Sequence, residues 1–222
     1  MVALGIGLIH HGLQSPTPPP QPTAAQRFPA HANPPPPVPI PRTAPISPAI
    51  PVSPTVMAQP MPTPAPAPAK PTRVRIPSIR VNAPLTGLSL TSDGKLASPP
   101  ETDRNLAGWY QDGTRPGSVG TAIIGGHVDT HSGRAVFYNL GALRKGSLID
   151  IDRADGTVVR FTIDAVEAYT DKQFPNDKVY GAAQRPELRL ITCGGGFDKR
   201  RQRYLGNVVA FAHLTDTRRA LP

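Results

Sequence analysis

The distribution of proline limits the fold of this 222-residue chain more than any other feature of its sequence. The chain has 30 prolines, and most of them lie between residues 16 and 71. Proline fixes φ and lacks the backbone donor that helices and sheets need, so neither is expected there. Such segments favour extended polyproline II, at about 3.1 Å per residue. We therefore interpret residues 15–71 as a disordered spacer, which leaves residues 72–222 for one folded domain.

The segment before the spacer is apolar. Residues 1–13 read MVALGIGLIHHGL, an apolar run interrupted by His10 and His11. This run is shorter than the roughly 20 apolar residues of a membrane span, and it lacks the basic start and cleavage site of a signal peptide. We expect residues 1–14 to be the remnant of a membrane anchor, with a disordered hydrophobic tail as the alternative. An apolar end followed by a spacer and a domain is the layout of an anchored extracellular enzyme.

The charge of the chain is strongly basic, with a formal net charge of +9 and a pI of about 10.2. A basic excess fits nucleic acid, but it fits an anionic cell wall or lipid surface equally well. The sequence has no row of aromatic stacking residues, no zinc-finger spacing and no long basic helix, so we expect no nucleic acid as a partner. It also shows no zinc-ligand cluster and no EF-hand-like loop. We expect neither a metal nor a cofactor.

Hydrophobic residues recur with a period of two from residue 72 onward, which is the signal of β-strands. Asp93-Gly94 and Asp155-Gly156 lie between short apolar stretches, where Asp-Gly is a strong hairpin signal. Helical signals are limited to one or two turns at residues 103–109 and 135–143. The expected strands cover residues 73–76, 79–81, 85–90, 121–124, 147–152, 157–163, 187–192 and 207–214. These many short strands predict an all-β domain, with about eight strands to close a small barrel.

Two groups of residues with reactive side chains lie at the ends of expected strands. His127 lies within GGHVD at residues 125–129, and Cys193, the one cysteine of the chain, lies within TCGG at residues 192–195. A cysteine nucleophile needs thiolate character from an adjacent base. Histidine can supply it and can also protonate a leaving amine. The two residues need to be neighbours only in the fold, so we predict a catalytic pair, with a buried inert thiol as the alternative.

A thiol enzyme also needs a group that stabilises the oxyanion of its tetrahedral intermediate. Arg201 and Arg203 lie about ten residues after Cys193, in a basic cluster at residues 199–203. If that segment folds back over the barrel end, an arginine reaches the site. Strand alternation places Arg203 on the same side as Asn207. We select Arg203 as the third catalytic residue and keep Arg201 as the alternative.

The residues around the nucleophile resemble a known family. The stretch LRLITCGG resembles the T-x-T-C signature of sortases, written here with residues 190–193, and GGHVD resembles the family's G-H-x segment. The pattern TCGG, then Phe197-Asp198, Tyr204 and residues 207–209, is closest to the actinobacterial class F sortases. The resemblance spans about residues 73–214, essentially the whole expected domain.

The resemblance implies both a fold and an activity. Sortases form a closed eight-stranded β-barrel and are anchored on the outside of mainly Gram-positive cells. They cleave surface proteins at an LPxTG-like signal through a cysteine acyl-enzyme, and they join the new carboxyl end to an amine of the cell wall or its precursor. Cys193 and His127 match the family's nucleophile and acid–base residue. In several classes an arginine lies at the position of Asn207, so the resemblance implies a hydrogen-bonding role for Asn207.

Other readings of the same residues remain open. A thiol hydrolase would use the same site with water as the acceptor, and a non-catalytic wall-binding β-module on a proline-rich stalk would leave Cys193 inert. Asp129 either orients the imidazole or caps a turn, and Thr192 is either a site residue or a plain strand threonine. Trp109 and Tyr110 either line a peptide groove or pack in the core. We expect His131 and His213 at the surface, and we expect the segment at residues 171–181 to shape the groove.

Overall fold

The computed structural model describes residues 18–29, 69–92, 94–198, 200 and 203–219. The apolar segment at residues 1–14 and most of the expected spacer lie outside these described residues. Among the described residues, no helix has the length and apolar character needed to cross a membrane.

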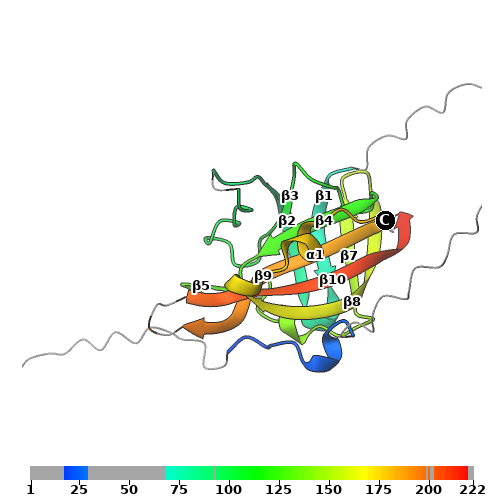
Figure 1. The fold of residues 1–222 in the computed structure, drawn as a ribbon. Helices are drawn as coiled ribbons and strands as arrows, with labels where there is room; N and C mark the ends of the chain where they lie inside the picture. Colours follow the sequence, from blue (N-terminus) through cyan, green and yellow to red (C-terminus); the bar gives the residue numbers. More distant parts are fainter. Residues whose placement is uncertain (1–17, 30–68, 93, 199, 201–202, 220–222) are drawn as a thin grey trace, which may run out of the picture. The chain divides into compact units, whose positions relative to one another are not determined.

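The described domain is a closed β-barrel (Figure 1). Its strands follow the order β1-β2-β3-β4-β9-β10-β8-β7 around the barrel, while β5 and β6 form a separate two-stranded ribbon. The strands are β1 (Pro71–Ile76), β2 (Val81–Leu88), β3 (Ala107–Tyr110), β4 (Gly120–Gly126), β5 (Asp129–Thr130), β6 (Gly133–Arg134), β7 (Leu148–Arg153), β8 (Thr157–Thr170), β9 (Pro186–Asp198) and β10 (Arg203–Arg219). The predicted all-β class and eight-stranded barrel are confirmed.

Helical structure in the described part of the chain is confined to short pieces. One α-helix, α1 (Asn176–Tyr180), lies between β8 and β9. The remaining pieces are the 3-10 turns η1 (Ala24–Gln26), η2 (Pro77–Ile79), η3 (Leu140–Ala142) and η4 (Asp171–Gln173). The expected helical turns at residues 135–143 are therefore reduced to η3. The expected helix at residues 103–109 is wrong, because Ala107 and Trp109 are buried and pair with β2 and β4 as part of strand β3.

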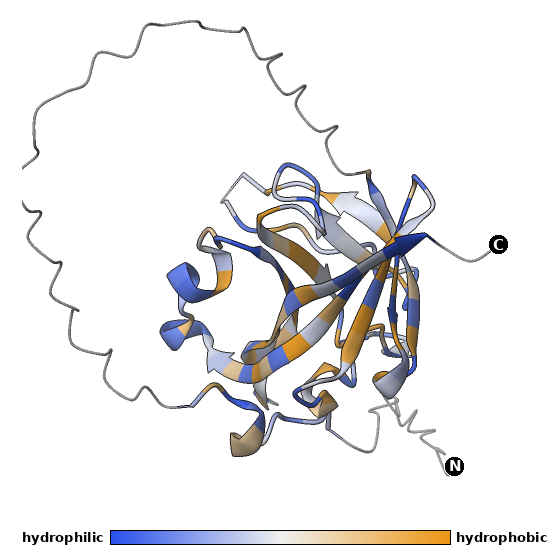
Figure 2. Cartoon of the chain, turned by 90° about the vertical axis from the view of Figure 1, so that its right-hand side faces the viewer, coloured by the Kyte–Doolittle hydropathy of each residue, from blue (hydrophilic) through white to orange (hydrophobic). Residues whose placement is uncertain are grey.

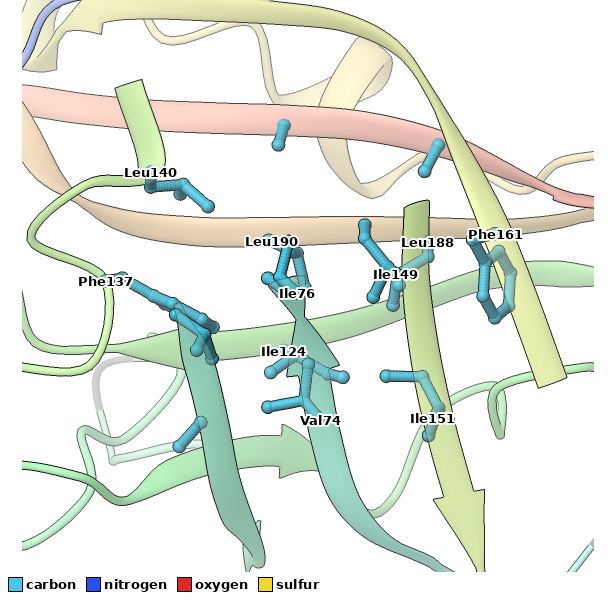
Figure 3. Packing of buried hydrophobic residues seen from close by; sticks show 14 of the residues in the cluster. Val74, Ile76, Ile124, Phe137, Leu140, Ile149, Ile151, Phe161, Leu188 and Leu190 are labelled. Carbon is cyan, nitrogen blue, oxygen red and sulfur yellow. The ribbon is translucent and has the colours of Figure 1, made fainter. Parts of the chain in front are cut away.

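Alternation along the strands produces the core. Apolar and polar residues alternate along the barrel strands (Figure 2), so that one face of each strand is turned inward. Val74, Ile124, Ile151, Phe161 and Leu190 come from five different strands, and all are completely buried. Figure 3 shows their side chains gathered inside the barrel. This interior packing holds β4 and β9 rigidly, which matters because both strands lead to the candidate site.

The predicted hairpin around Asp155-Gly156 is confirmed as the β7–β8 pair. Gly156 has a φ of +73°, a left-handed conformation that glycine adopts without the steric cost of a side chain. β8 continues well beyond the predicted stretch to Thr170 and pairs with β10 along its length.

Residues 18–28 differ from the expected spacer, because they contact the barrel (blue in Figure 1). The backbone N–H of Phe28 donates to Glu167 Oε1 at 2.9 Å, and Gln26 Oε1 accepts a hydrogen bond from the N–H of Lys145 at 3.2 Å. Pro22 is buried. Proline density excludes regular helix and sheet, but it does not prevent an irregular segment from packing through side chains and isolated hydrogen bonds.

Candidate active site

The parallel pairing of β4 with β9 brings the expected base and nucleophile together. Gly125 lies opposite Ile191 in this pair, and His127 and Cys193 each follow two positions later in the sequence. The two strands run in the same direction, so equal steps along each chain lead to neighbouring positions at one end of the barrel. The predicted juxtaposition of His127 and Cys193 thus follows from the strand register.

Strand alternation also explains why both side chains are accessible. The neighbouring residues Ile124 and Leu190 project into the core and are completely buried (Figure 3). Cys193 is three positions beyond Leu190 in the sequence and is exposed, as alternation requires. His127 and Cys193 line the same pocket, which has a volume of about 600 Å³.

Several parts of the chain form this pocket, including Leu90 and, on β3, Tyr110. Strands β4, β9 and β10 contribute Ile123, Ile191 and Asn207, among others. The segment at residues 94–99 contributes a second part, and α1 contributes a third through Asn176 and Tyr180. Much of the lining is apolar, which suits an apolar peptide side chain better than a highly charged ligand.

The His127 ring contacts the segment at residues 94–99. Its Nε2 lies 2.7 Å from the carbonyl oxygen of Pro99. A carbonyl oxygen only accepts hydrogen bonds, so Nε2 is the protonated nitrogen in this contact. In the neutral ring, Nδ1 is then the nitrogen with the lone pair available to a thiol proton. The Pro99 carbonyl thus fixes both the tautomer and the orientation of the imidazole.

The surroundings of Cys193 favour the protonated thiol. Partial removal of the sulfur from water raises the pKa of Cys193, and the negative charges of Asp129 and Asp171 raise it further. A nucleophilic role therefore requires a base that removes the thiol proton. His127 lines the same pocket and is the candidate for this base.

Asp129 has a partner that the sequence did not reveal. Tyr204 donates a hydrogen bond of 2.6 Å to Asp129 Oδ2, and the ring of Phe197 packs edge-on against Tyr204 with centroids 5.0 Å apart. This chain of contacts attaches the β9–β10 hairpin to β5, which begins two residues after His127. The Asp129 carboxylate therefore holds Tyr204, and this contact does not decide between the two expected roles of Asp129.

The sequence predicted that the strand before Cys193 ends at this residue, but the strand continues beyond it. β9 continues to Asp198 and pairs with β10 beyond Cys193. Gly195 and Gly196 have φ values of +71° and +103°, and the register with β10 shifts between Tyr204 and Gly206. A bulge of this kind needs left-handed residues, which explains the glycines that follow the cysteine.

The predicted arginine is placed only by its backbone. Arg203 begins β10 and pairs with Asp198, whereas Asn207 pairs directly with Cys193. The side chain of Arg203 and the whole of Arg201 lie outside the described residues. The selection of Arg203 as the third catalytic residue therefore stays a prediction.

A family comparison identifies this arrangement. A family model described as the sortase domain matches residues 74–215, well over half of the chain. The chain belongs to the sortase family. A search of curated proteins gave no match.

Solved structures of sortases share the barrel of this sortase. They include sortase A from Listeria monocytogenes, with 17% identity and a TM-score of 0.50, over 69% of this chain and 92% of that one. Sortase C-1 from Actinomyces oris has 19% identity and a TM-score of 0.51, over 65% and 73%. Sortase A from Corynebacterium diphtheriae has 18% identity and a TM-score of 0.51, over 69% and 63%. At these identities the likeness shows the fold, and the resemblance to class F stays a prediction.

The structure shows where the other residues singled out from the sequence lie in this sortase. Trp109 is buried whereas Tyr110 lines the pocket, so the two expected roles are divided between neighbours on β3. Thr192 is 4% exposed, and its buried Oγ1 has no hydrogen-bond partner among the described residues, but the residue also lines the pocket, so both expected roles stay open. His213 Nδ1 lies 2.7 Å from Asp164 Oδ1, and His131 is at the surface, as expected. Neither histidine lines the pocket.

For two parts of the pocket, the sequence did not predict which residues line it. The segment at residues 94–99 carries the partner of His127, but it has no periodicity to mark it. The groove-shaping role expected for residues 171–181 is consistent with α1, whose Asn176 and Tyr180 line the pocket. A helix of five residues is too short for an amphipathic pattern, so its form was not predictable. Among the described residues, no group of three or more His, Cys, Asp or Glu side chains is arranged to hold a metal.

Proposed function

We propose that this sortase is a cysteine transpeptidase that cleaves surface proteins at an LPxTG-like signal and transfers them to an amine of the cell wall. The observation that carries the proposal is the convergence of His127 and Cys193 in one open pocket. A general base beside an exposed thiol is the minimum that acyl transfer through a thioester requires.

The pocket suits a signal that begins with apolar residues. Leu90 and Tyr180 are 49% and 46% exposed, and both line the pocket together with Leu96 and Ile191. A ligand that covers exposed apolar side chains around a cleft removes them from water, and this burial favours binding. The leucine and proline of an LPxTG-like signal would provide such a cover.

The chemistry then proceeds in two balanced halves. His127 takes the thiol proton of Cys193, and the thiolate attacks the carbonyl carbon of the scissile peptide bond. When the tetrahedral intermediate collapses, the C–N bond breaks and the imidazolium of His127 protonates the departing amine. In the second half, an acceptor amine attacks the thioester and loses a proton to His127, and the thiolate leaves. An amide replaces the original amide, so no external energy source is needed.

The oxyanion of each intermediate needs donors near the nucleophile. We assign this role to Arg203, supported by its place on β10, the strand that pairs with the nucleophile's strand. Asn207 lies directly opposite Cys193 and also lines the pocket. Its amide is a second candidate donor for the substrate carbonyl.

The location and partners follow from the same proposal. The enzyme would lie on the extracellular face of the membrane, anchored through residues 1–14 and extended by the proline-rich segment. Its partners would be surface proteins with a C-terminal sorting signal and an amine of peptidoglycan or its precursor. The net charge of +9 favours residence in an anionic wall.

A peptide transpeptidation assay tests the proposal. A fluorogenic LPxTG-type peptide is incubated with an amine nucleophile and with the wild type, Cys193→Ala, His127→Ala or the exposed control His131→Ala. We expect amide product with the wild type and the control, and a loss of about a thousandfold or more in the other two variants. Turnover that survives Cys193→Ala would exclude the thiol mechanism.

The same assay separates the alternatives. Hydrolysed peptide without amide product at saturating amine would favour a thiol hydrolase of the same fold. No turnover with any scanned signal sequence, together with unchanged binding to isolated cell walls after alkylation of Cys193, would favour a wall-binding module.

A further inference from the structure

We propose that residues 18–28, through Glu167 and Lys178, position helix α1 and thereby set the affinity of the pocket for its peptide. This inference rests on the proposed function only for the identity of the peptide. The positioning itself is a property of the folded chain and can be measured without substrate.

Glu167 joins three parts of the chain at one buried carboxylate. It lies on β8 and is 8% exposed. Its Oε1 accepts from the backbone N–H of Phe28 at 2.9 Å, and its Oε2 accepts from Lys178 Nζ at 2.7 Å and from the hydroxyl of Tyr169. A buried carboxylate is costly unless such donors satisfy it. Loss of one donor therefore weakens the arrangement of the others.

The ionisation of Glu167 agrees with this geometry. Burial opposes the charged form, but the hydrogen bonds from Lys178, Tyr169 and the backbone of Phe28 outweigh it and hold the pKa of Glu167 below its usual value. The carboxylate is therefore charged at neutral pH, and the Lys178 ammonium has a fixed counter-charge.

Lys178 and Phe28 also contact each other directly. The Lys178 Nζ lies 4.8 Å from the centroid of the Phe28 ring and 5.2 Å from that of Phe211. The Phe28 and Phe211 rings pack edge to face with centroids 5.3 Å apart. An ammonium held over two aromatic faces is favourable, particularly where water is partly excluded. Removing Phe28 would leave Lys178 with the Phe211 ring, the more distant Tyr169 ring at 5.8 Å, and more water.

Helix α1 depends on these contacts because it is short. A helix of five residues is not stable alone, so its position is set by what it packs against. Val179 is completely buried beside Val209 and Phe211, and Lys178 bonds to Glu167. Asn176 and Tyr180 are four positions apart, share a face of the helix, and line the pocket. The contacts of residues 178 and 179 thus determine where residues 176 and 180 lie.

The segment is attached at a second place, to residues that do not line the pocket. The carbonyl oxygen of Pro20 lies so close to Gly141 that a Cβ added there would be 2.0 Å from it. Gln26 also accepts a hydrogen bond from the backbone of Lys145. Substitution of Gly141 by a larger residue should therefore displace the segment without touching the pocket lining.

The experiment compares the full chain with Phe28→Ala, Phe28→Tyr and the control Leu148→Ala. Leu148 is 41% exposed and Phe28 is 37% exposed, so the control removes a side chain of comparable exposure elsewhere on the barrel. Hydrogen exchange is followed at residues 176–180, and kcat and KM are measured with an LPxTG-type peptide. Gly141→Val serves as an independent way to displace the segment.

We expect Phe28→Ala and Gly141→Val to accelerate exchange at residues 176–180 and to raise KM about three- to tenfold with kcat little changed. Phe28→Tyr should keep the exchange rate at residues 176–180 and KM at their wild-type values. Leu148→Ala should alter neither quantity. Unchanged exchange in both segment variants would overturn the proposal. Faster exchange with an unchanged KM would overturn the link to peptide affinity. If the wild type turns over no peptide, the proposed function fails, and the exchange data alone decide the positioning.

Discussion

Asn207 lies directly opposite Cys193 in the β9–β10 ladder, and its Nδ2 donates a hydrogen bond of 3.4 Å to the carbonyl oxygen of Thr192. The amide therefore holds the backbone next to the nucleophile, in a position where family resemblance places an arginine in several sortase classes. Rigid support of this kind matters because small displacements of a reacting group reduce rates sharply.

We predict that Asn207→Ala lowers kcat by about tenfold without a large change in stability, because the peptide next to Cys193 loses its support. Steady-state kinetics with an LPxTG-type peptide checks this prediction. The control is Asn105→Ala, an exposed asparagine that does not line the pocket. Equal kcat values for Asn207→Ala and the wild type would show that the amide has no catalytic consequence.

The Asp129 carboxylate should control the reactivity of the thiol. Partial burial of Cys193 is the largest cause of its raised pKa, and the charge of Asp129 is the next. We predict that Asp129→Asn lowers the pKa of Cys193, so that iodoacetamide reacts faster at pH 8, while burial keeps the pKa above its ordinary value. The rate of alkylation is measured from pH 6 to pH 10.

Asp155→Asn is the matched control for this profile, because Asp155 lies on the exposed β7–β8 turn. An alkylation profile of Asp129→Asn that coincides with that of the wild type would show that the charge of Asp129 does not act on the thiol.

Acid should weaken the barrel through Asp150. Its Oδ1 and Oδ2 accept hydrogen bonds from Arg160 at 2.7 and 2.9 Å, and Arg218 adds another at 3.0 Å. The Arg160 hydrogen bond, opposed by burial, holds the pKa of Asp150 below its usual value. A lowered folded-state pKa contributes stability above the unfolded-state pKa, and that stability is lost as the pH falls through the folded-state value.

We therefore predict that Asp150→Asn reduces the free energy of unfolding by about 1–3 kcal/mol at pH 7. The difference from the wild type should shrink as the pH falls below about 4, the ordinary value of the unfolded-state carboxyl, and on through the lower folded-state pKa. Urea titrations at pH 7 and pH 3 provide the comparison. A difference that stays constant between the two pH values would contradict this account.

Core packing on β9 should support the site as well as the fold. Leu190 is completely buried three residues before Cys193. We predict that Leu190→Ala lowers the free energy of unfolding by about 2–5 kcal/mol, because it removes buried methyl groups and leaves a cavity. Leu205→Ala, at a leucine that is 38% exposed, should cost about 0.5 kcal/mol or less. Similar losses for the two variants in denaturant titrations would contradict the assignment of the core.

Sequence reasoning succeeded where local pattern and geometry agree. Alternation with a period of two predicted the β7–β8 hairpin and the inward face of β9, because strand residues are sorted by burial at every second position. The placement of His127 and Cys193 in one pocket was predictable because each follows an apolar stretch and lies beside glycines. The register of β4 with β9 then explains why they converge.

The features that the sequence left open depend on contacts between distant residues. Trp109 and Tyr110 lie in a strand because that segment pairs with β2 and β4, which flank it. The Tyr204–Asp129 hydrogen bond joins residues 75 positions apart, and the Phe28–Glu167 bond joins residues 139 positions apart. No local pattern records such pairs. The same holds for the Pro99 carbonyl that orients His127.

The central claim is that Cys193 forms a thioester with the cleaved signal, and intact-protein mass spectrometry tests it most directly. The wild type and Cys193→Ala are mixed with an LPxTG-type peptide, quenched in acid, and then digested to locate the adduct. We predict a mass increase equal to the amino-terminal part of the peptide, located on Cys193, absent in Cys193→Ala and discharged as amide product when an amine is added. Peptide cleavage by the wild type through an adduct on another residue, or cleavage by Cys193→Ala, would contradict the account.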